Sequence, residues 1–85
     1  MRAEDLLPDE QNQGQFSGVT VRKGTVGAFL LNARAWLDPA SSARQQAEAE
    51  RDIVDALPAL QALGLFDLLQ VRDAKLRELI SRPAR

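Results

Sequence analysis

Cysteine, histidine and tyrosine are all absent from this 85-residue chain, and tryptophan occurs once. Without cysteine there are no disulfides, thiolate metal sites or cysteine nucleophiles. Without histidine the chain lacks the side chain that most often serves as general base and as metal ligand. A catalytic centre would have to be assembled from Ser, Lys, Asp or Glu alone. We therefore expect a protein that is not an enzyme and that uses no cofactor and no metal.

Long apolar runs and a strong net charge are also missing. The first thirteen residues, MRAEDLLPDEQNQ, are acidic and polar, and no run of 18 apolar residues follows. This pattern argues against a signal peptide and against a membrane span. The net charge is −1, so no overall field attracts nucleic acid or an anionic membrane. We expect a cytoplasmic protein that does not bind a membrane, and the composition does not favour nucleic acid as a partner.

The remaining composition is that of an ordinary globular protein, with 45% hydrophobic and 27% charged residues. A chain of this length forms one small domain with a modest core. We predict a mainly α fold in which three to four helices form a small compact bundle behind a short N-terminal β-hairpin or extended segment. We divide the chain into a flexible acidic tail at 1–14, a single helical domain at 15–82 and a flexible end at 83–85.

The front of this domain has the pattern of a β-hairpin. Ser17-Gly18 is a turn dipeptide that separates Gln15-Phe16 from the β-branched run VTV,. In such a hairpin Phe16, Val19 and Val21 lie on one side, which needs a helix to pack against because an isolated hairpin is marginally stable.

A helix is predicted to follow from Thr25, which we assign as its N-cap after Gly24,. Helical spacing predicts a core stripe on this helix. Its members are Val26, Phe29, Leu30, Ala33, Trp36 and Leu37. We interpret Trp36 as a core anchor.

The second half of the chain is predicted to be helical as well. Asp38-Pro39 has the pattern of a helix start. We expect its buried stripe to be Ala40, Ala43, Ala47, Val54 and Leu57, with Ile53 at the margin. Pro58 is predicted to interrupt or kink this helix, and Gly64 to end a short helix after it. The last helix is predicted at about 68–81, ended by Pro83, with an apolar face of Leu69, Leu76, Leu79 and Ile80.

The turn at 22–27, RKGTVG, allows two interpretations. In the first, free amides at the helix N-terminus bind an anion, and the residues involved are Lys23, Gly24, Thr25 and Gly27. The turn matches neither of the common phosphate-binding glycine motifs. In the second, Gly24 relieves the corner and Gly27 makes room for a crossing segment. Glycine inside a helix costs roughly 0.5–1 kcal/mol relative to alanine, so we favour the packing interpretation.

The missing catalytic residue types and the small size favour a protein that works by binding. We expect a protein–protein interaction module or a homodimer. The interface residues would be Ala28, Leu31, Ala35 and Phe66. The alternative is a small-molecule or nucleotide-phosphate binder that uses the helix N-terminus at Gly24–Ala28.

Two segments carry a resemblance to a known family. KGTVGAFLLN at 23–32, followed by LPALQALGLFDLL at 57–69, resembles a family of short uncharacterised bacterial proteins, a domain of unknown function. Its members have a short β-like segment, a G-T-V-G-A helix start and an alanine-rich helix leading to an L-x-x-x-G-x-F-D ending. The resemblance covers residues 19–69 and implies a bacterial origin. It brings no activity, cofactor or site residue.

Overall fold

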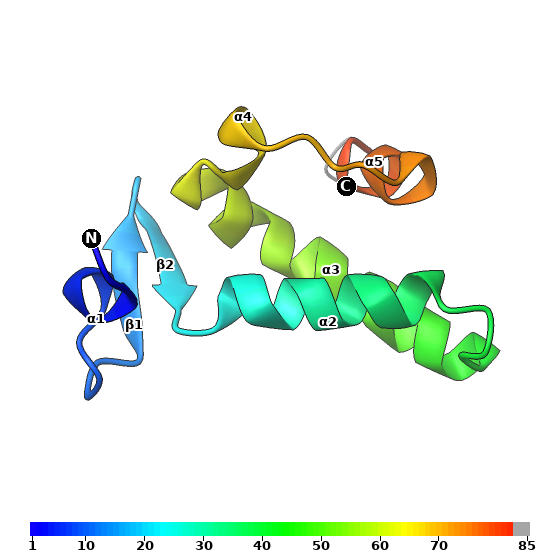
Figure 1. Cartoon of the computed structure of the whole chain (residues 1–85), viewed down its shortest axis with the longest axis horizontal. Coiled ribbons are helices and arrows are strands. Elements are labelled where there is room, and N and C mark those ends of the chain that lie inside the picture. The colour runs from blue at the N-terminus through cyan, green and yellow to red at the C-terminus, as the bar shows by residue number, and fades with distance from the viewer. Residues whose placement is uncertain (83–85) are drawn as a thin grey trace.

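The computed structural model describes residues 1–82 and divides them into one β-hairpin and five helices (Figure 1). The elements along the chain are α1 (Ala3–Leu6), β1 (Gln13–Phe16), β2 (Val19–Arg22), α2 (Thr25–Leu37), α3 (Ala43–Leu63), α4 (Leu65–Leu68) and α5 (Ala74–Ile80). The mainly α class with an N-terminal hairpin is confirmed. The described part has more helices than predicted because α1 and α4 are single turns of four residues. The predicted flexible end, 83–85, lies outside the described residues.

The hairpin forms where the sequence predicts it. β1 and β2 pair antiparallel, and Ser17 and Gly18 form the turn. Their φ angles are 49° and 78°, and positive values at both positions are what a type I′ hairpin turn requires. Val21 is buried, and the Ser17 Oγ donates a hydrogen bond to the Ala62 carbonyl oxygen at 3.5 Å. The tip of the hairpin therefore lies against the end of α3.

The N-terminal segment, predicted as a tail over 1–14, contacts the hairpin. Leu7 is buried. The Lys23 ammonium donates to the carbonyl oxygens of Pro8 and Asp9 at 2.8 and 3.0 Å. β1 also takes the last two residues of that segment. The contacts hold α1 beside the hairpin at one end of the molecule (Figure 1).

The start of α2 differs by one residue from the prediction. Gly24 is the N-cap, with φ 86°, and Thr25 is the first helical residue. The Thr25 hydroxyl donates to the Arg22 carbonyl oxygen at 2.6 Å instead of capping an amide. The chain turns from β2 into α2 through a left-handed conformation, which glycine adopts readily and a β-branched residue does not.

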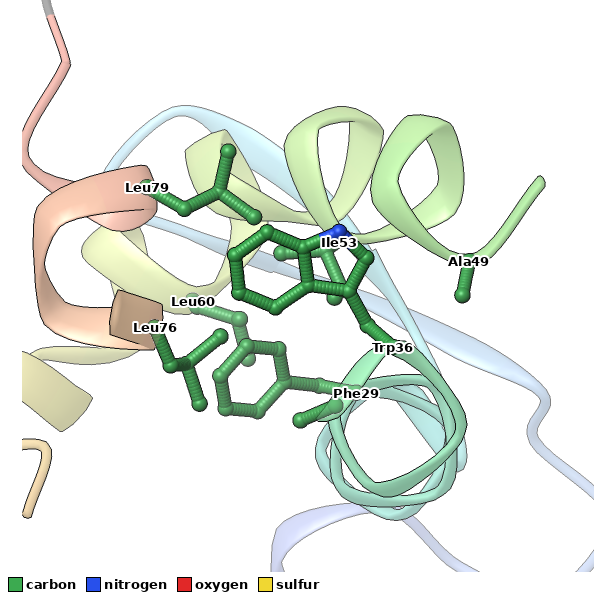
Figure 2. Close-up of a cluster of buried hydrophobic side chains, with 8 residues drawn as sticks. Phe29, Trp36, Ala49, Ile53, Leu60, Leu76 and Leu79 are labelled. Atoms are coloured by element: carbon green, nitrogen blue, oxygen red, sulfur yellow. The ribbon is translucent and has the colours of Figure 1, made fainter. Parts of the chain in front are cut away.

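The core lies where α2, α3 and α5 meet (Figure 2). Its buried residues are Phe29, Ala33, Trp36, Ala49, Ile53, Leu60, Leu76 and Leu79. Figure 2 shows Phe29 and Trp36 pointing from α2 toward the other two helices. The Phe66 ring packs edge-on against Phe29 at 5.9 Å between centroids, and the Lys75 ammonium lies 4.7 Å from the Trp36 ring centre,. Trp36 is thus confirmed as a core anchor.

The buried stripe of α3 is offset from the predicted one. Ile53 and Leu60 have no exposed surface, whereas Val54 is 45% exposed and Ala43 and Ala47 are exposed. Both stripes are apolar in sequence, so which of them is buried depends on the helix against which α3 packs. Rotating α3 toward Ile53 places its larger branched side chain against the aromatic rings of α2, where it buries more apolar area.

α3 also begins later than predicted, at Ala43. Ser42 and Gln45 cap it reciprocally: the Ser42 Oγ accepts from the Gln45 amide at 3.1 Å, and the Ser42 amide donates to Gln45 Oε1 at 2.8 Å. This capping box fixes the helix start. Asp38 instead accepts from the Ala40 amide at 2.9 Å within the preceding turn. The predicted start at Asp38-Pro39, which would have made Ala40 helical, is therefore wrong.

Pro58 does not interrupt the helix, since α3 continues through it to Leu63, so the predicted separate short helix after Pro58 is wrong. A proline removes the hydrogen bond to the carbonyl four residues earlier, here that of Val54. Val54 and Pro58 are both exposed, so water can replace the missing donor. Gly64, with φ 80°, ends the helix as predicted,.

The last helix is shorter than predicted. α5 spans only Ala74–Ile80, because the Asp73 carboxylate caps it by accepting from the Leu76 amide at 2.9 Å,. Leu69, predicted on its apolar face, lies in the connection after α4 and is exposed. Leu76 and Leu79 are buried as predicted. Pro83, its predicted stop, lies outside the described residues.

The molecule is more open than most chains of its length. Its radius of gyration is 13.7 Å, against roughly 12 Å for a compact domain of this size. It exposes 6467 Å² of surface, and a folded monomer of this mass exposes about 5,000 Å². The cause is visible in Figure 1, where α1 and the hairpin project at one end and α2 extends away from them.

We predict that Ile53→Ala lowers the free energy of unfolding by about 2–4 kcal/mol, because it leaves a cavity in the core. Val54→Ala on the same helix should cost less than about 1 kcal/mol, since Val54 is half-exposed,. Chemical denaturation of both variants measures the difference. Equal losses, or a larger loss for Val54→Ala, would contradict the observed stripe.

Candidate functional site

α2 has too little charge for a helix on the surface. Only one of its 13 residues, Arg34, is charged. A helix that is apolar all round is normally covered on every side. Here one side forms the core, while the other exposes Leu30 and Leu31 to 55% and 67%. Gly27, Leu30, Leu31 and Arg34, spaced three and four apart, lie on one face, which we call the outer face of α2.

The predicted core stripe of α2 is therefore wrong at two positions. Val26 and Leu30 are exposed, whereas Phe29, Ala33 and Trp36 are buried. The two aromatic side chains need the space between α2 and the other helices, so they set the rotation of α2. Leu30, about 100° further round the helix than Phe29, is then turned toward solvent.

The four predicted interface residues do not share one surface. Ala28 and Leu31 are exposed, but Ala35 is half-buried and its carbonyl accepts from the Ser41 hydroxyl at 2.7 Å. Phe66 is half-buried against Phe29, on the opposite side of α2 from Leu31. Leu30, which we predicted to be in the core, is exposed and lies beside Leu31 on the outer face of α2.

Gly27 has no packing role among the described residues. A Cβ added there would meet no atom within 4 Å. The prediction that Gly27 makes room for a crossing segment is therefore wrong for the residues that the structure describes. Gly24 differs, because its φ of 86° is a conformation that other residues rarely adopt,.

A cavity of about 410 Å³ lies between α1, the hairpin and the start of α2. Its lining includes all four residues predicted for anion binding, Lys23, Gly24, Thr25 and Gly27. The volume is within the usual range for small-molecule sites. Apolar lining comes from residues that include Leu6, Leu7, Phe16, Val21, Val26 and Leu63.

The electrostatics of this cavity are balanced. Lys23 already donates to two carbonyl oxygens of the N-terminal segment, and Glu4 and Asp9 line the cavity as well. The Ala28 amide, one of the predicted anion donors, forms the first helical hydrogen bond to the Gly24 carbonyl at 2.8 Å. Only the amides before Ala28 therefore lack a hydrogen bond within the helix,.

A second groove, of about 610 Å³, separates α2 from α3 and the hairpin. It is lined by Asp52 and Asp55 together with Arg22, so opposite charges share it. Among residues 1–82 no cluster of three or more acidic side chains is placed to bind a metal ion. None of the described helices combines the length and apolarity needed to cross a membrane.

No family model, no curated protein and no solved structure matches this chain. The family resemblance of residues 19–69 therefore stays a prediction.

We predict that Gly27→Ala raises the free energy of unfolding of dilute protein by about 0.5–1 kcal/mol, because alanine restricts the unfolded chain and its Cβ meets nothing,. Gly24→Ala should lower it by about 1 kcal/mol or more, because φ there is positive,. Denaturation curves recorded at low micromolar concentration measure both. A loss of stability for Gly27→Ala would mean that the chain itself needs this glycine.

Proposed function

We propose that the protein is a small, non-catalytic cytoplasmic binding module that contacts another protein, or a second copy of itself, through the outer face of α2. The observation that carries this proposal is the exposure of Leu30 and Leu31 on a helix with one charge. Burying a leucine side chain is worth about 1.5–3 kcal/mol. Covering both leucines therefore supplies a substantial part of a binding free energy.

The fold does not need these two side chains. In this proposal α2, α3 and α5 form a small helical bundle, and its core is filled by Phe29 and Trp36 with the buried residues of the other two helices. Leu30 and Leu31 contribute little to that core at their exposure. Apolar side chains that are surplus to the core, gathered on one face, are typical of protein interaction sites.

A photo-reactive amino acid placed at Leu31 tests this function in the cells that make the protein. We expect ultraviolet light to attach a second polypeptide there. The matched control is the same amino acid at Arg51, an exposed residue on the polar side of α3, which should give no adduct. The absence of any adduct at position 31, or equal yields at both positions, would contradict the proposal.

The cavity at the start of α2 supports a second candidate, a small-molecule or nucleotide-phosphate binder. The supporting observation is that Lys23, Gly24, Thr25 and Gly27 line one cavity of ligand size. Two observations weigh against this second candidate. The Lys23 ammonium already donates to two carbonyl oxygens, and the carboxylates of Glu4 and Asp9 would repel an anion.

An amide-resolved NMR titration with inorganic phosphate and a panel of nucleotides tests this second candidate. Binding predicts saturable shifts confined to Gly24 through Gly27, at the amides that precede the first helical hydrogen bond,. Lys23→Met should reduce these shifts, and Lys75→Met, which changes a lysine outside the cavity lining, should not. Unchanged spectra at millimolar ligand would remove this candidate.

A further inference from the structure

We infer that residues 1–12 form a strap that closes over the apolar face of the hairpin and opens as a unit while the core of α2, α3 and α5 stays folded. We call this segment the N-terminal strap. Its opening uncovers Phe16 and Val21 beside the start of α2. The inference concerns a different surface from the outer face of α2 and does not depend on the proposed function.

The hairpin has one apolar face that needs a cover. In its register Gly14 lies opposite Val21 and Phe16 lies opposite Val19, and these four residues share one face because side chains alternate along a strand,. A two-stranded hairpin is marginally stable in water unless another element packs on such a face. The N-terminal strap supplies Leu7, which is buried together with Val21.

The hairpin face has a space that Leu7 occupies. A Cβ added to Gly14 would lie 3.0 Å from Leu7 Cδ2 and 3.1 Å from the Phe16 ring. Both distances are shorter than the optimal separation of two carbon atoms, so the leucine fills the position that a larger residue at 14 would take. The closed position of the strap is therefore a specific contact and not a chance approach of a chain end.

The polar contacts of the strap all lie close to the hairpin. The Lys23 ammonium, directly after β2, donates to the carbonyl oxygens of Pro8 and Asp9 at 2.8 and 3.0 Å. The Lys23 amide donates to the Asn12 carbonyl oxygen at 2.6 Å. Among residues 1–82, the hydrogen bonds of the strap reach no residue beyond Lys23. Releasing Leu7 and Lys23 therefore releases the whole segment.

The strap is separate from the main core. Leu7 is its only buried residue, and neither Leu7 nor Val21 belongs to the buried cluster that α2, α3 and α5 share. Figure 1 shows α1 beside the hairpin, at the opposite end of the molecule from α5.

The strap also packs loosely. The cavity of about 410 Å³ lies between α1, the hairpin and the start of α2, so most of the surface that α1 turns toward the hairpin makes no close contact. Segments with few buried apolar contacts open at a lower free energy than the core of the same protein. The strap can thus open without unfolding α2 and α3.

A glutamate-specific protease added to the native full chain tests the inference. Cleavage after Glu10 requires the protease to extend the chain around that bond, which pulls out Leu7 and the carbonyl groups that Lys23 holds. Cleavage after Glu48 or Glu50 requires α3 to unfold. We expect the cut after Glu10 to be at least about tenfold faster, because local opening is more frequent than global unfolding. Mass spectrometry of the fragments gives the initial rate of each cut.

Substitutions in the strap and in the core should act on different cuts. Leu7→Ala should raise the rate of cleavage after Glu10 about tenfold or more, because it removes most of the buried side chain, and Lys23→Met should raise it by a smaller factor. Ile53→Val is the matched change in the core. It should raise cleavage within α3 about two- to tenfold and leave cleavage after Glu10 unchanged.

Two results would overturn the inference. An equal rise at both places in Ile53→Val would mean that the strap opens only when the core unfolds. Cleavage of the original chain after Glu10 as fast as in the double variant Leu7→Ala/Lys23→Met would mean that the strap is not held closed.

NMR spectra of the same double variant test whether opening uncovers the hairpin face. A soluble paramagnetic probe should broaden the Val21 methyl signals more in the double variant than in the original chain, where Val21 is buried. The Ile53 methyl signals should stay protected in both. Equal protection of Val21 in the two proteins would mean that the strap does not cover this face, and would also overturn the inference.

Discussion

The packing of Phe29 and Trp36 between α3 and α5 positions the rest of the molecule. These two side chains on one side of α2 define the core and hold α5 against α3 (Figure 2). They also set the rotation of α2, so the helix turns its second apolar side outward. The exposed leucines are thus a direct consequence of the core, because a helix with a single charge cannot present a polar surface whichever side it buries,.

A chain of this length has too few helices to enclose α2. α3 covers one side of it, α5 reaches it only through side chains, and the hairpin with α1 lies at its N-terminal end (Figure 1). Small domains bury a smaller share of their surface than large ones, and an additional subunit is one way to bury the remainder.

The sequence predicts those elements that depend on local chemistry. The hairpin rests on the Ser17-Gly18 turn, and the end of α3 rests on the left-handed conformation of Gly64,. It predicts the buried side of a helix only in part: Leu76 and Leu79 of α5 are buried as predicted, but the buried stripe of α3 is not the predicted one. On α3, Ile53 and Val54 are both apolar neighbours, and the position of the aromatic rings on α2 favours burial of the larger Ile53,. The exposed Leu30 and the open position at Gly27 follow from that same tertiary choice, so helical spacing alone could not identify the outer face of α2.

The most direct test of this account measures which methyl groups of the protein face water. A soluble paramagnetic probe broadens the NMR signals of exposed groups and spares those of buried groups. The account predicts strong broadening of the Leu30 and Leu31 methyl signals and weak broadening of those of Ile53 and Leu60 in dilute protein. Strong broadening at Ile53 and Leu60, or protected methyl groups at Leu30 and Leu31, would contradict it.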